Sequence, residues 1–288
     1  MILTQRCNVR SSESKQHIEN ALNDLDINEL NDGDITLDKI NRDWSIYQLK
    51  KGHRYSADDM LTAWMANRVA GDIDIQADIG AGIGSCGLMT LWKRSSTSKL
   101  VMIEAQKVSH ELAKRSITYN NLQHRIDARY GDLRDVTVLP EQGFFPLVTG
   151  TPPYFPIDKA LTSPHPQRAC CRMELRGNVY DYAKTASRII HPEGWFVCCH
   201  AGSDPRLEDA MTENGFHVWH RQDVLFRIDK EPTISIVACR RMAGPREDWT
   251  PLVIRTLEGQ ETDRYRSLRV EMGHEPPENN SDHNRLQS

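Results

Sequence analysis

The chain has 288 residues, of which 39% are apolar, so it is long enough to bury the core of one large domain or two small ones. The 36 Lys and Arg residues against 40 Asp and Glu residues give a net charge of -4, which excludes binding of nucleic acid through overall positive charge. No window approaches the roughly 18 consecutive apolar residues of a transmembrane helix, and the N-terminal segment lacks the apolar stretch of a secretion signal. Seven cysteines without a CxxC pair predict neither a disulfide framework nor a zinc site. We therefore expect a reduced, cytoplasmic protein without a membrane span or a metal.

Both ends of the chain are polar. Residues 1–43 form an acidic extension, richest in Asp, Glu and Asn from position 20 on, for which a short helix and disorder are both open and which offers a surface to a protein partner. Residues 273–288 are rich in Pro, Asn, Glu and Ser and are expected to form a disordered tail. The folded domain is therefore expected at residues 44–272.

Within this domain, short apolar runs alternate with segments of helical pattern. Strands that alternate with helices predict an α/β protein whose mainly parallel sheet is covered by helices on both faces. Ligands of such sheets bind at the carboxyl ends of the strands. In chain order we expect strands at 73–78, 100–104, 126–130, 145–149, 195–200, 217–220 and 233–239, and helices at 109–121, at 179–190 and from 204 to the glycine at 215.

A glycine-rich loop follows the first of these strands. Its glycines, Gly80, Gly82 and Gly84, alternate with other residues after Asp78, and glycine allows both positive φ and close approach of a ligand to the backbone. Glu104 ends the next strand, where an acid can bind both hydroxyls of a ribose. Because the segment also fits GxGxxG, the loop by itself is compatible with a dinucleotide.

A third acid separates these possibilities. Asp132, followed by Leu133, comes directly after the strand at 126–130, where a carboxylate can accept a hydrogen bond from the exocyclic amine of adenine. Read alone, a Gly-Asp pair is an ordinary turn. Because Asp132 follows the glycine loop and Glu104 at the end of the next strand, it favours a methyl donor that contains adenosine over a nicotinamide.

The strand at 145–149 ends in a proline-rich loop. Pro152 and Pro153 have no backbone N–H, so nearby carbonyls stay free to accept from a substrate amine. Tyr154 and Phe155 follow at once, and a planar base stacked on an aromatic ring gains about 1–3 kcal/mol. A rigid loop with buried aromatic rings is the alternative interpretation.

Together, the glycine loop, the two acids and the Thr-Pro-Pro-Tyr loop resemble the class I S-adenosylmethionine-dependent methyltransferases. Within these, the chain is similar to the adenine-N6 branch, whose corresponding loop reads Asn/Asp-Pro-Pro-Tyr/Phe, and to the bacterial tRNA(Val) adenine-N6 methyltransferase family in particular. The resemblance spans about residues 44–272 and includes the segment Tyr55–Trp64. It implies a Rossmann-like fold with a seven-stranded, mostly parallel sheet, and S-adenosylmethionine as the donor with S-adenosylhomocysteine as the product.

The resemblance also implies roles for individual residues. One departure from the family matters, because Thr151 stands where the family has Asn or Asp, and its hydroxyl offers less than an amide or a carboxylate. The implied catalytic residues are Thr151, Pro152, Pro153 and Tyr154, the implied donor-binding residues are Tyr55, Asp58, Asp78, Gly80, Gly82, Gly84, Glu104, Asp132 and Leu133, and the implied substrate contacts are Phe155, Arg172 and Arg176.

The expected activity is methylation of adenine N6 in RNA, with tRNA favoured and rRNA as the other RNA substrate. Such a transfer needs mainly the positioning of an amine against the methyl group, and no metal. Two alternatives stay open: an N-methyltransferase for a protein glutamine or a small-molecule amine, and a catalytically silent protein that binds the donor and serves as a scaffold. A nicotinamide-dependent enzyme ranks below these.

Overall fold

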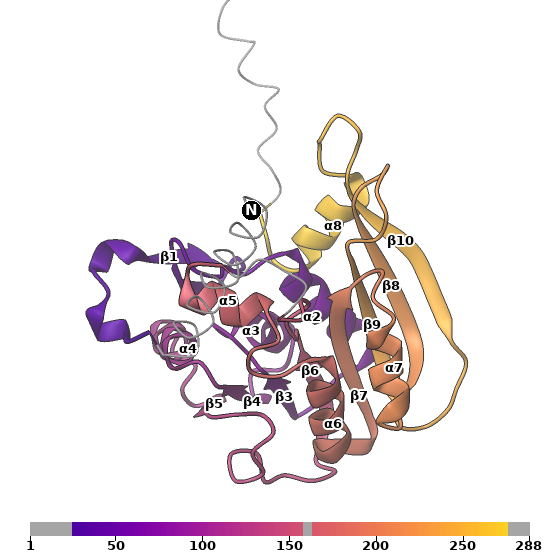
Figure 1. Cartoon of the computed structure of the whole chain (residues 1–288), viewed down its shortest axis with the longest axis horizontal. Helices are drawn as coiled ribbons and strands as arrows, with labels where there is room; N and C mark the ends of the chain where they lie inside the picture. The colour runs from indigo at the N-terminus through magenta and orange to yellow at the C-terminus, as the bar shows by residue number, and fades with distance from the viewer. Residues whose placement is uncertain (1–24, 158–162, 276–288) are drawn as a thin grey trace, which may run out of the picture.

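The computed structural model describes residues 25–157 and 163–275, and its centre is one eight-stranded sheet (Figure 1). The strand order is β10-β8-β9-β7-β6-β3-β4-β5, and all neighbours are parallel except β9, which runs antiparallel to β7 and to β8. The Rossmann-like α/β fold is thus confirmed. The strands are β3 (Ile75–Ile79), β4 (Lys99–Glu104), β5 (Ile126–Tyr130), β6 (Phe145–Gly150), β7 (Ile190–Ala201), β8 (His217–Arg227), β9 (Ile234–Arg240) and β10 (Glu247–Arg255).

The expected number of seven strands is wrong by one, because β10 adds a further strand at the edge. This strand contains Pro251, and its pairing with β8 shifts register between Trp249 and Leu252. Only Leu252 and Ile254 are buried along it. A proline and a half-exposed pattern are tolerated at a sheet edge but weaken the strand signal in the sequence.

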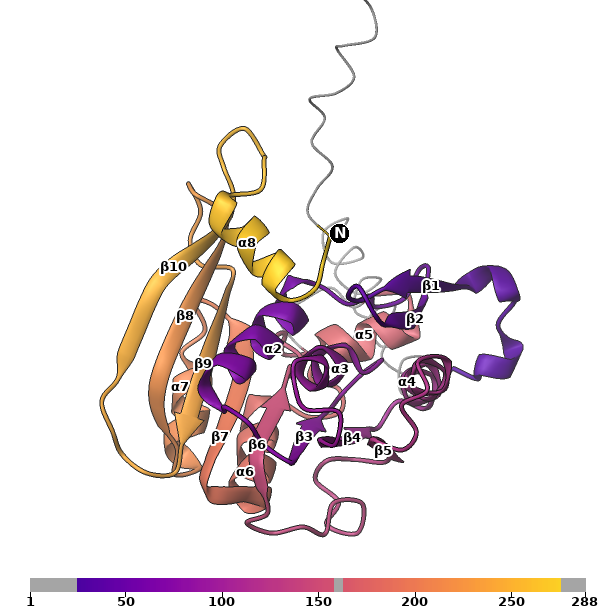
Figure 2. The same ribbon diagram turned by 180° about the vertical axis from the view of Figure 1, so that it is seen from behind.

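Helices cover both faces of the sheet (Figures 1 and 2). One core cluster joins α2, α3, α4 and α8 to one face, and a second joins α6 and α7 to the other. Within the described residues, no helix is long and apolar enough to cross a membrane. The helices are α2 (Ala57–Val69), α3 (Ser85–Trp92), α4 (Lys107–Tyr119), α5 (Pro166–Arg172), α6 (Val179–Ile189), α7 (Arg206–Glu213) and α8 (Asp263–Glu271).

A two-stranded hairpin, β1 (Ile35–Lys39) and β2 (Ser45–Leu49), precedes the sheet. Its β2 strand is tied to α4, where the Tyr47 N–H donates to the Ser116 hydroxyl at 2.9 Å. The expected domain start at residue 44 falls inside this hairpin, so packed structure begins earlier, with the short 3-10 helices η1 (Ile27–Glu29) and η2 (Asp32–Asp34). Residues 1–24 and 276–288, the rest of the expected extension and tail, lie outside the described residues.

The residues Pro192, Glu193 and Gly194, which favour a turn, are part of strand β7, so the strand begins before the expected residue 195. Between the pairs Phe145 to Ile190 and Leu147 to Trp195, β7 advances five residues while β6 advances two, so the turn residues are taken up as an irregularity of the pairing. The strand therefore starts at Ile190, directly after α6. Turn-forming residues inside an irregular strand look like a loop in the sequence.

We expect Asn178→Ala to lower the free energy of unfolding by about 1 kcal/mol, because this side chain caps α6. Its Oδ1 accepts from the N–H groups of Tyr180 and Asp181, and Asp181 bonds back to the cap backbone. Urea unfolding measures the change, with Lys184→Ala on the exposed side of the same helix as the control. Equal stabilities of the two variants would contradict the capping role.

Candidate active site

The first cavity of the site lies where β3, β4 and β6 end. It brings together five of the predicted donor-binding residues with Thr151 and Pro153 of the proline-rich loop. Arg176, which we expected at the substrate, lines this cavity instead, and its guanidinium donates to the Ala105 carbonyl at 3.1 Å. The predicted donor-binding residues that line this donor cavity are Gly80, Gly82, Glu104, Asp132 and Leu133.

The glycine loop has the conformation that its sequence predicts. Gly80 and Gly82 have φ of 63° and 58°, where side chains are strained. A Cβ on Gly80 would lie 1.8 Å from the Tyr182 hydroxyl, whereas a Cβ on Gly82 would have no protein atom within 4 Å. The Gly82 N–H donates to Glu104 Oε2 at 2.7 Å. Gly82 therefore leaves open space beside the cavity, and Glu104 holds the loop around it.

The carboxylates of the cavity differ in their surroundings. Burial raises the pKa of Glu104, although its carboxylate accepts the N–H groups of Gly82 and Gln106. Asp132 accepts from the Arg134 guanidinium at 2.6 and 2.9 Å, and this hydrogen-bonded cation lowers its pKa. Asp132 is thus held as a carboxylate, and an ionised carboxylate has further lone pairs for a ligand.

Two predicted donor-binding residues stand behind the cavity and do not line it. Asp78 is 1% exposed, and its carboxyl accepts from the Gly87 N–H at 2.9 Å and from the Thr149 hydroxyl at 2.7 Å. Burial raises its pKa to about 7. Gly84 caps α3 with φ 91°, and a Cβ there would lie 2.5 Å from Met102 Cε. Both residues shape the loop from inside the protein.

A second cavity, of about 920 Å³, opens on the other side of Thr151. Tyr55 and Asp58, which the sequence predicted at the donor, line this acceptor cavity and not the donor cavity. Its volume is that of sites for drug-sized ligands. The predicted catalytic and substrate residues that line it are Thr151, Pro152, Tyr154, Phe155 and Arg172.

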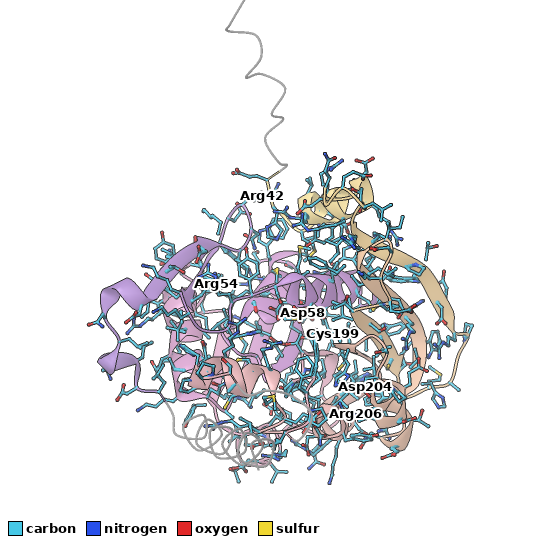
Figure 3. The ribbon with its side chains drawn as sticks, turned by 45° about the horizontal axis from the view of Figure 1, so that its top comes forward. Arg42, Arg54, Asp58, Cys199, Asp204 and Arg206 are labelled. Atoms are coloured by element: carbon cyan, nitrogen blue, oxygen red, sulfur yellow. The ribbon has the colours of Figure 1, made fainter. Side chains whose placement is uncertain are left out.

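Tyr154 is fixed by contacts that the sequence did not reveal. Its hydroxyl donates to Asp58 Oδ2 at 2.8 Å and lies 3.2 Å from Cys199 Sγ, and burial raises its pKa well above the usual range. Figure 3 shows Asp58 and Cys199 close together in the interior. The ring of His200, a residue with no exposed surface, packs 5.3 Å from the Tyr154 ring. The hydroxyl end of Tyr154 is therefore held in place.

Arg206 anchors the same loop from α7. Its guanidinium donates to the Tyr154 carbonyl at 3.2 Å and forms ion pairs with Glu174 and Asp204, each at 2.6 Å. The hydrogen bond to Asp204 raises the pKa of Arg206. Figure 3 labels Asp204 and Arg206 next to each other. In the sequence these two residues indicated only the start of a helix, since nothing local shows that an arginine reaches a loop 52 residues away.

The two cavities meet at four residues. Each of these side chains lines both the donor and the acceptor cavity, so a group that passes from one to the other passes between them. Within residues 25–157 and 163–275, no group of His, Cys, Asp or Glu side chains is arranged to hold a metal ion. The four residues are His53, Asp59, Thr151 and Cys171.

The chain shares this architecture with proteins of known structure. A "predicted O-methyltransferase" of Agrobacterium tumefaciens superposes with a TM-score of 0.59 over 76% of this chain and 98% of its own, at 20% identity. TYW2 of P. horikoshii in complex with MeSAdo superposes with a TM-score of 0.52 over 73% of this chain and 72% of its own, at 13% identity. At these identities the likeness is one of fold. No family model matches the chain.

The fold and the donor cavity are similar to those of class I S-adenosylmethionine-dependent methyltransferases, and the sequence matches point to the same class of enzyme. Among curated proteins it is similar to the tRNA1(Val) (adenine(37)-N6)-methyltransferase of Flavobacteriaceae bacterium strain 3519-10, with 26% identity over 66% of this chain and 78% of that protein. The enzyme of the same name from Erwinia tasmaniensis is 23% identical over 59% of this chain and 68% of its own length.

The cavity residues fit this donor. The open space at Gly82 allows a ligand to lie against the backbone, which a Cβ would prevent. Glu104 and Asp132 present carboxylates after two consecutive strands, and buried Leu133 supplies an apolar surface beside them. Carboxylates for hydroxyl and amine groups, an apolar side chain for a base and a glycine cradle are what an adenosine with a methionine chain requires.

The two glycines of the loop are expected to respond differently to Ala. Both variants place a side chain at positive φ, at a cost of about 1–2 kcal/mol. Gly80→Ala also forces its methyl group against Tyr182 and should unfold at lower urea than Gly82→Ala. In Gly82→Ala the methyl group enters the open space, so the variant should stay folded but bind S-adenosylmethionine weakly in calorimetric titration. Wild-type donor affinity in Gly82→Ala would contradict this assignment.

Proposed function

We propose that the protein transfers the methyl group of S-adenosylmethionine to N6 of an adenine in RNA, with tRNA favoured. The observation that carries the proposal is the position of Thr151 between a donor cavity with an adenosine-binding pattern and a wide acceptor cavity lined by aromatic and basic side chains. The printed names of the two curated relatives, both tRNA adenine-N6 methyltransferases, support the choice of substrate.

On the donor side, each group has a task that its geometry allows. Glu104 holds the ribose hydroxyls, Asp132 accepts from the adenine amine, and Leu133 packs against the base. Gly80 and Gly82 let the methionine part approach the backbone, while Asp78 and Gly84 maintain the loop from behind. When bound, the donor supplies an electrophilic methyl group, so the protein has mainly to align a nucleophile with it.

On the acceptor side, the proline-rich loop holds the target base. The Thr151 hydroxyl and the Pro152 carbonyl accept hydrogen bonds from the exocyclic amine, and Tyr154 stacks on the ring. Because Asp58, Cys199 and Arg206 fix Tyr154, stacking costs little side-chain freedom. A base in an RNA loop reaches such a pocket at a modest unstacking cost.

Cations beside aromatic rings at the acceptor cavity support an RNA substrate. Arg172 lies 5.4 Å from the ring of Phe155, and Arg255 lies 5.8 Å from the ring of Phe226, which is 55% exposed. Exposed rings stack on bases, and guanidinium groups bind phosphates. The net charge of -4 belongs to the whole chain and does not prevent positive charge from gathering at this cavity. Four further cations line the same cavity: Lys50, Lys51, Arg54 and Arg168.

The alternatives differ in the pool that receives the methyl group. Protein incubated with radiolabelled donor and separate pools of tRNA, rRNA, DNA and protein should label tRNA, and the product should digest to N6-methyladenosine. Label in protein or in a small amine would replace the proposal with the alternative N-methyltransferase. Tight donor binding without transfer to any pool would favour the silent scaffold, for which residues 1–43 are the proposed protein contact.

Tyr154→Ala is expected to slow transfer to RNA by about 5- to 150-fold, which corresponds to the loss of 1–3 kcal/mol of stacking. Donor affinity should be unchanged, since Tyr154 does not line the donor cavity. Tyr154→Phe keeps the ring for stacking and removes the hydroxyl that donates to Asp58, so it should lose less activity than Tyr154→Ala. Single-turnover rates distinguish the two, and full activity of Tyr154→Ala would refute stacking.

Arg172→Ala and Arg255→Ala should each weaken RNA binding and reduce the salt dependence of the binding constant. One lost phosphate contact lowers the slope of log K against log salt by about 0.7–0.9. Fluorescence anisotropy with labelled tRNA at several salt concentrations measures this slope, and Lys184→Ala, which does not line the acceptor cavity, serves as control. If both slopes equal the wild-type value, RNA does not cross this cavity.

A further inference from the structure

The junction between the two cavities contains one carboxyl group. Of the four side chains there, Thr151 carries a hydroxyl that cannot take up a proton at neutral pH, and burial raises the pKa of the Cys171 thiol so that it stays neutral. The imidazole of His53 carries no negative charge. Asp59 alone combines a position at the junction with an acidic group.

We propose that Asp59 is a catalytic residue that shares with the Thr151 hydroxyl the amine N–H that the Pro152 carbonyl does not accept, and then takes up its proton. The inference rests on the proposed function and explains how the site works with Thr151 in the proline-rich loop. The additional acceptor would come from the first turn of α2, since Asp59, like Thr151, lines both cavities.

The position of Asp59 is fixed by the start of that helix. Its Oδ2 accepts the Ser56 N–H at 3.1 Å in a capping box, and the Ser85 hydroxyl also bonds to the carboxyl group. A carboxylate has about four lone-pair sites, so these two bonds leave room for an amine. Asp59 is 7% exposed and keeps its orientation without a bound substrate.

The surroundings of Asp59 favour its protonated form in the absence of a bound cation. Burial raises its pKa to about 8, and the neighbouring Asp58 adds to this. A sulfonium in the adjoining cavity is a positive charge, which favours the carboxylate. The other titratable groups around Asp59, from its own helix and the elements packed against it, are Asp58, Asp78, His53, Tyr55, Cys86, Cys171 and Cys199.

The transfer then balances without any further reactant. The lone pair of the amine nitrogen forms the N–C bond, and the electrons of the broken C–S bond stay on sulfur. One proton of the resulting ammonium passes to the Asp59 carboxylate. Positive charge develops on the nitrogen during the transfer, and a carboxylate beside it lowers the energy barrier. The uncharged imidazole of His53 would lower this barrier less.

Asp59→Asn is the direct test, since an Asn side chain has the same shape and can still accept the Ser56 N–H. We expect its single-turnover rate with tRNA to fall about 10²- to 10⁴-fold, the usual range for loss of a general base. Affinity for S-adenosylhomocysteine, which carries no sulfonium charge, should be unchanged and shows that the variant is folded. Asp72→Asn, on the exposed surface after α2, is the matched control. A rate within threefold of wild type would overturn the inference.

A second variant returns the acceptor to the loop. Thr151→Asp in the Asp59→Asn background should recover at least about tenfold of the lost rate, because it supplies a carboxylate from the other side of the junction. His53→Gln in the wild-type background should cost less than Asp59→Asn. No recovery in the double variant with intact S-adenosylhomocysteine binding, or a greater loss in His53→Gln, contradicts the role of Asp59.

A measurement without RNA separates this inference from the proposed function. Calorimetry at pH 7 in buffers of different ionisation heat should show release of up to about one proton when wild type binds S-adenosylmethionine, much less with S-adenosylhomocysteine, and none from this group in Asp59→Asn. If the wild-type protein releases this proton but methylates no RNA, the proposed RNA substrate is wrong, whereas the position of Asp59 beside the sulfonium is supported. Equal release with both ligands, or in both proteins, contradicts the inference.

Discussion

The hydrogen bond from the Tyr154 hydroxyl to Asp58 ties the acceptor loop to the start of α2. Through this bond, two segments nearly one hundred residues apart form opposite walls of one cavity, and the residue after Asp58 comes to lie at the junction with the donor cavity. Arg206 and His200 support the loop from the other side of the sheet end. The site therefore depends on an interior contact more than on the loop sequence itself.

Buried carboxyl groups surround the place where a cationic donor binds. Burial raises the pKa of Asp59, Asp78 and Glu104 alike, which means that each charge is unfavourable in the free protein. A bound positive charge relieves this cost, and a ligand that binds only the folded state stabilises it by an amount that grows with the logarithm of the ligand concentration. Part of the donor affinity therefore comes from the attraction between its positive charge and these carboxyl groups.

The sequence predicted the parts of the fold whose signals are local. Runs of β-branched residues marked the central strands, and Asn178 marked the start of α6. Tertiary contacts decide what the sequence did not indicate: the edge strand β10, the hairpin that begins before residue 44, and the inward orientation of Asp78. Asp58 and Asp59 are adjacent in sequence and point about 100° apart on the helix. Only the packed cap determines which of them reaches the donor cavity.

Because β10 lies at the sheet edge, the acceptor cavity and the donor cavity differ in local stability. Ile254 and Arg255 belong to the acceptor cavity alone, while the donor cavity lies at the ends of the central strands β3, β4 and β6 and, through Asp132, beside β5 at the opposite edge of the sheet. Edge elements open locally at lower free energy than central ones. Fraying of β10 would widen the entrance for a bulky acceptor and leave the donor grip unchanged, so that the protein is rigid where it holds a small molecule and compliant where it admits a large one.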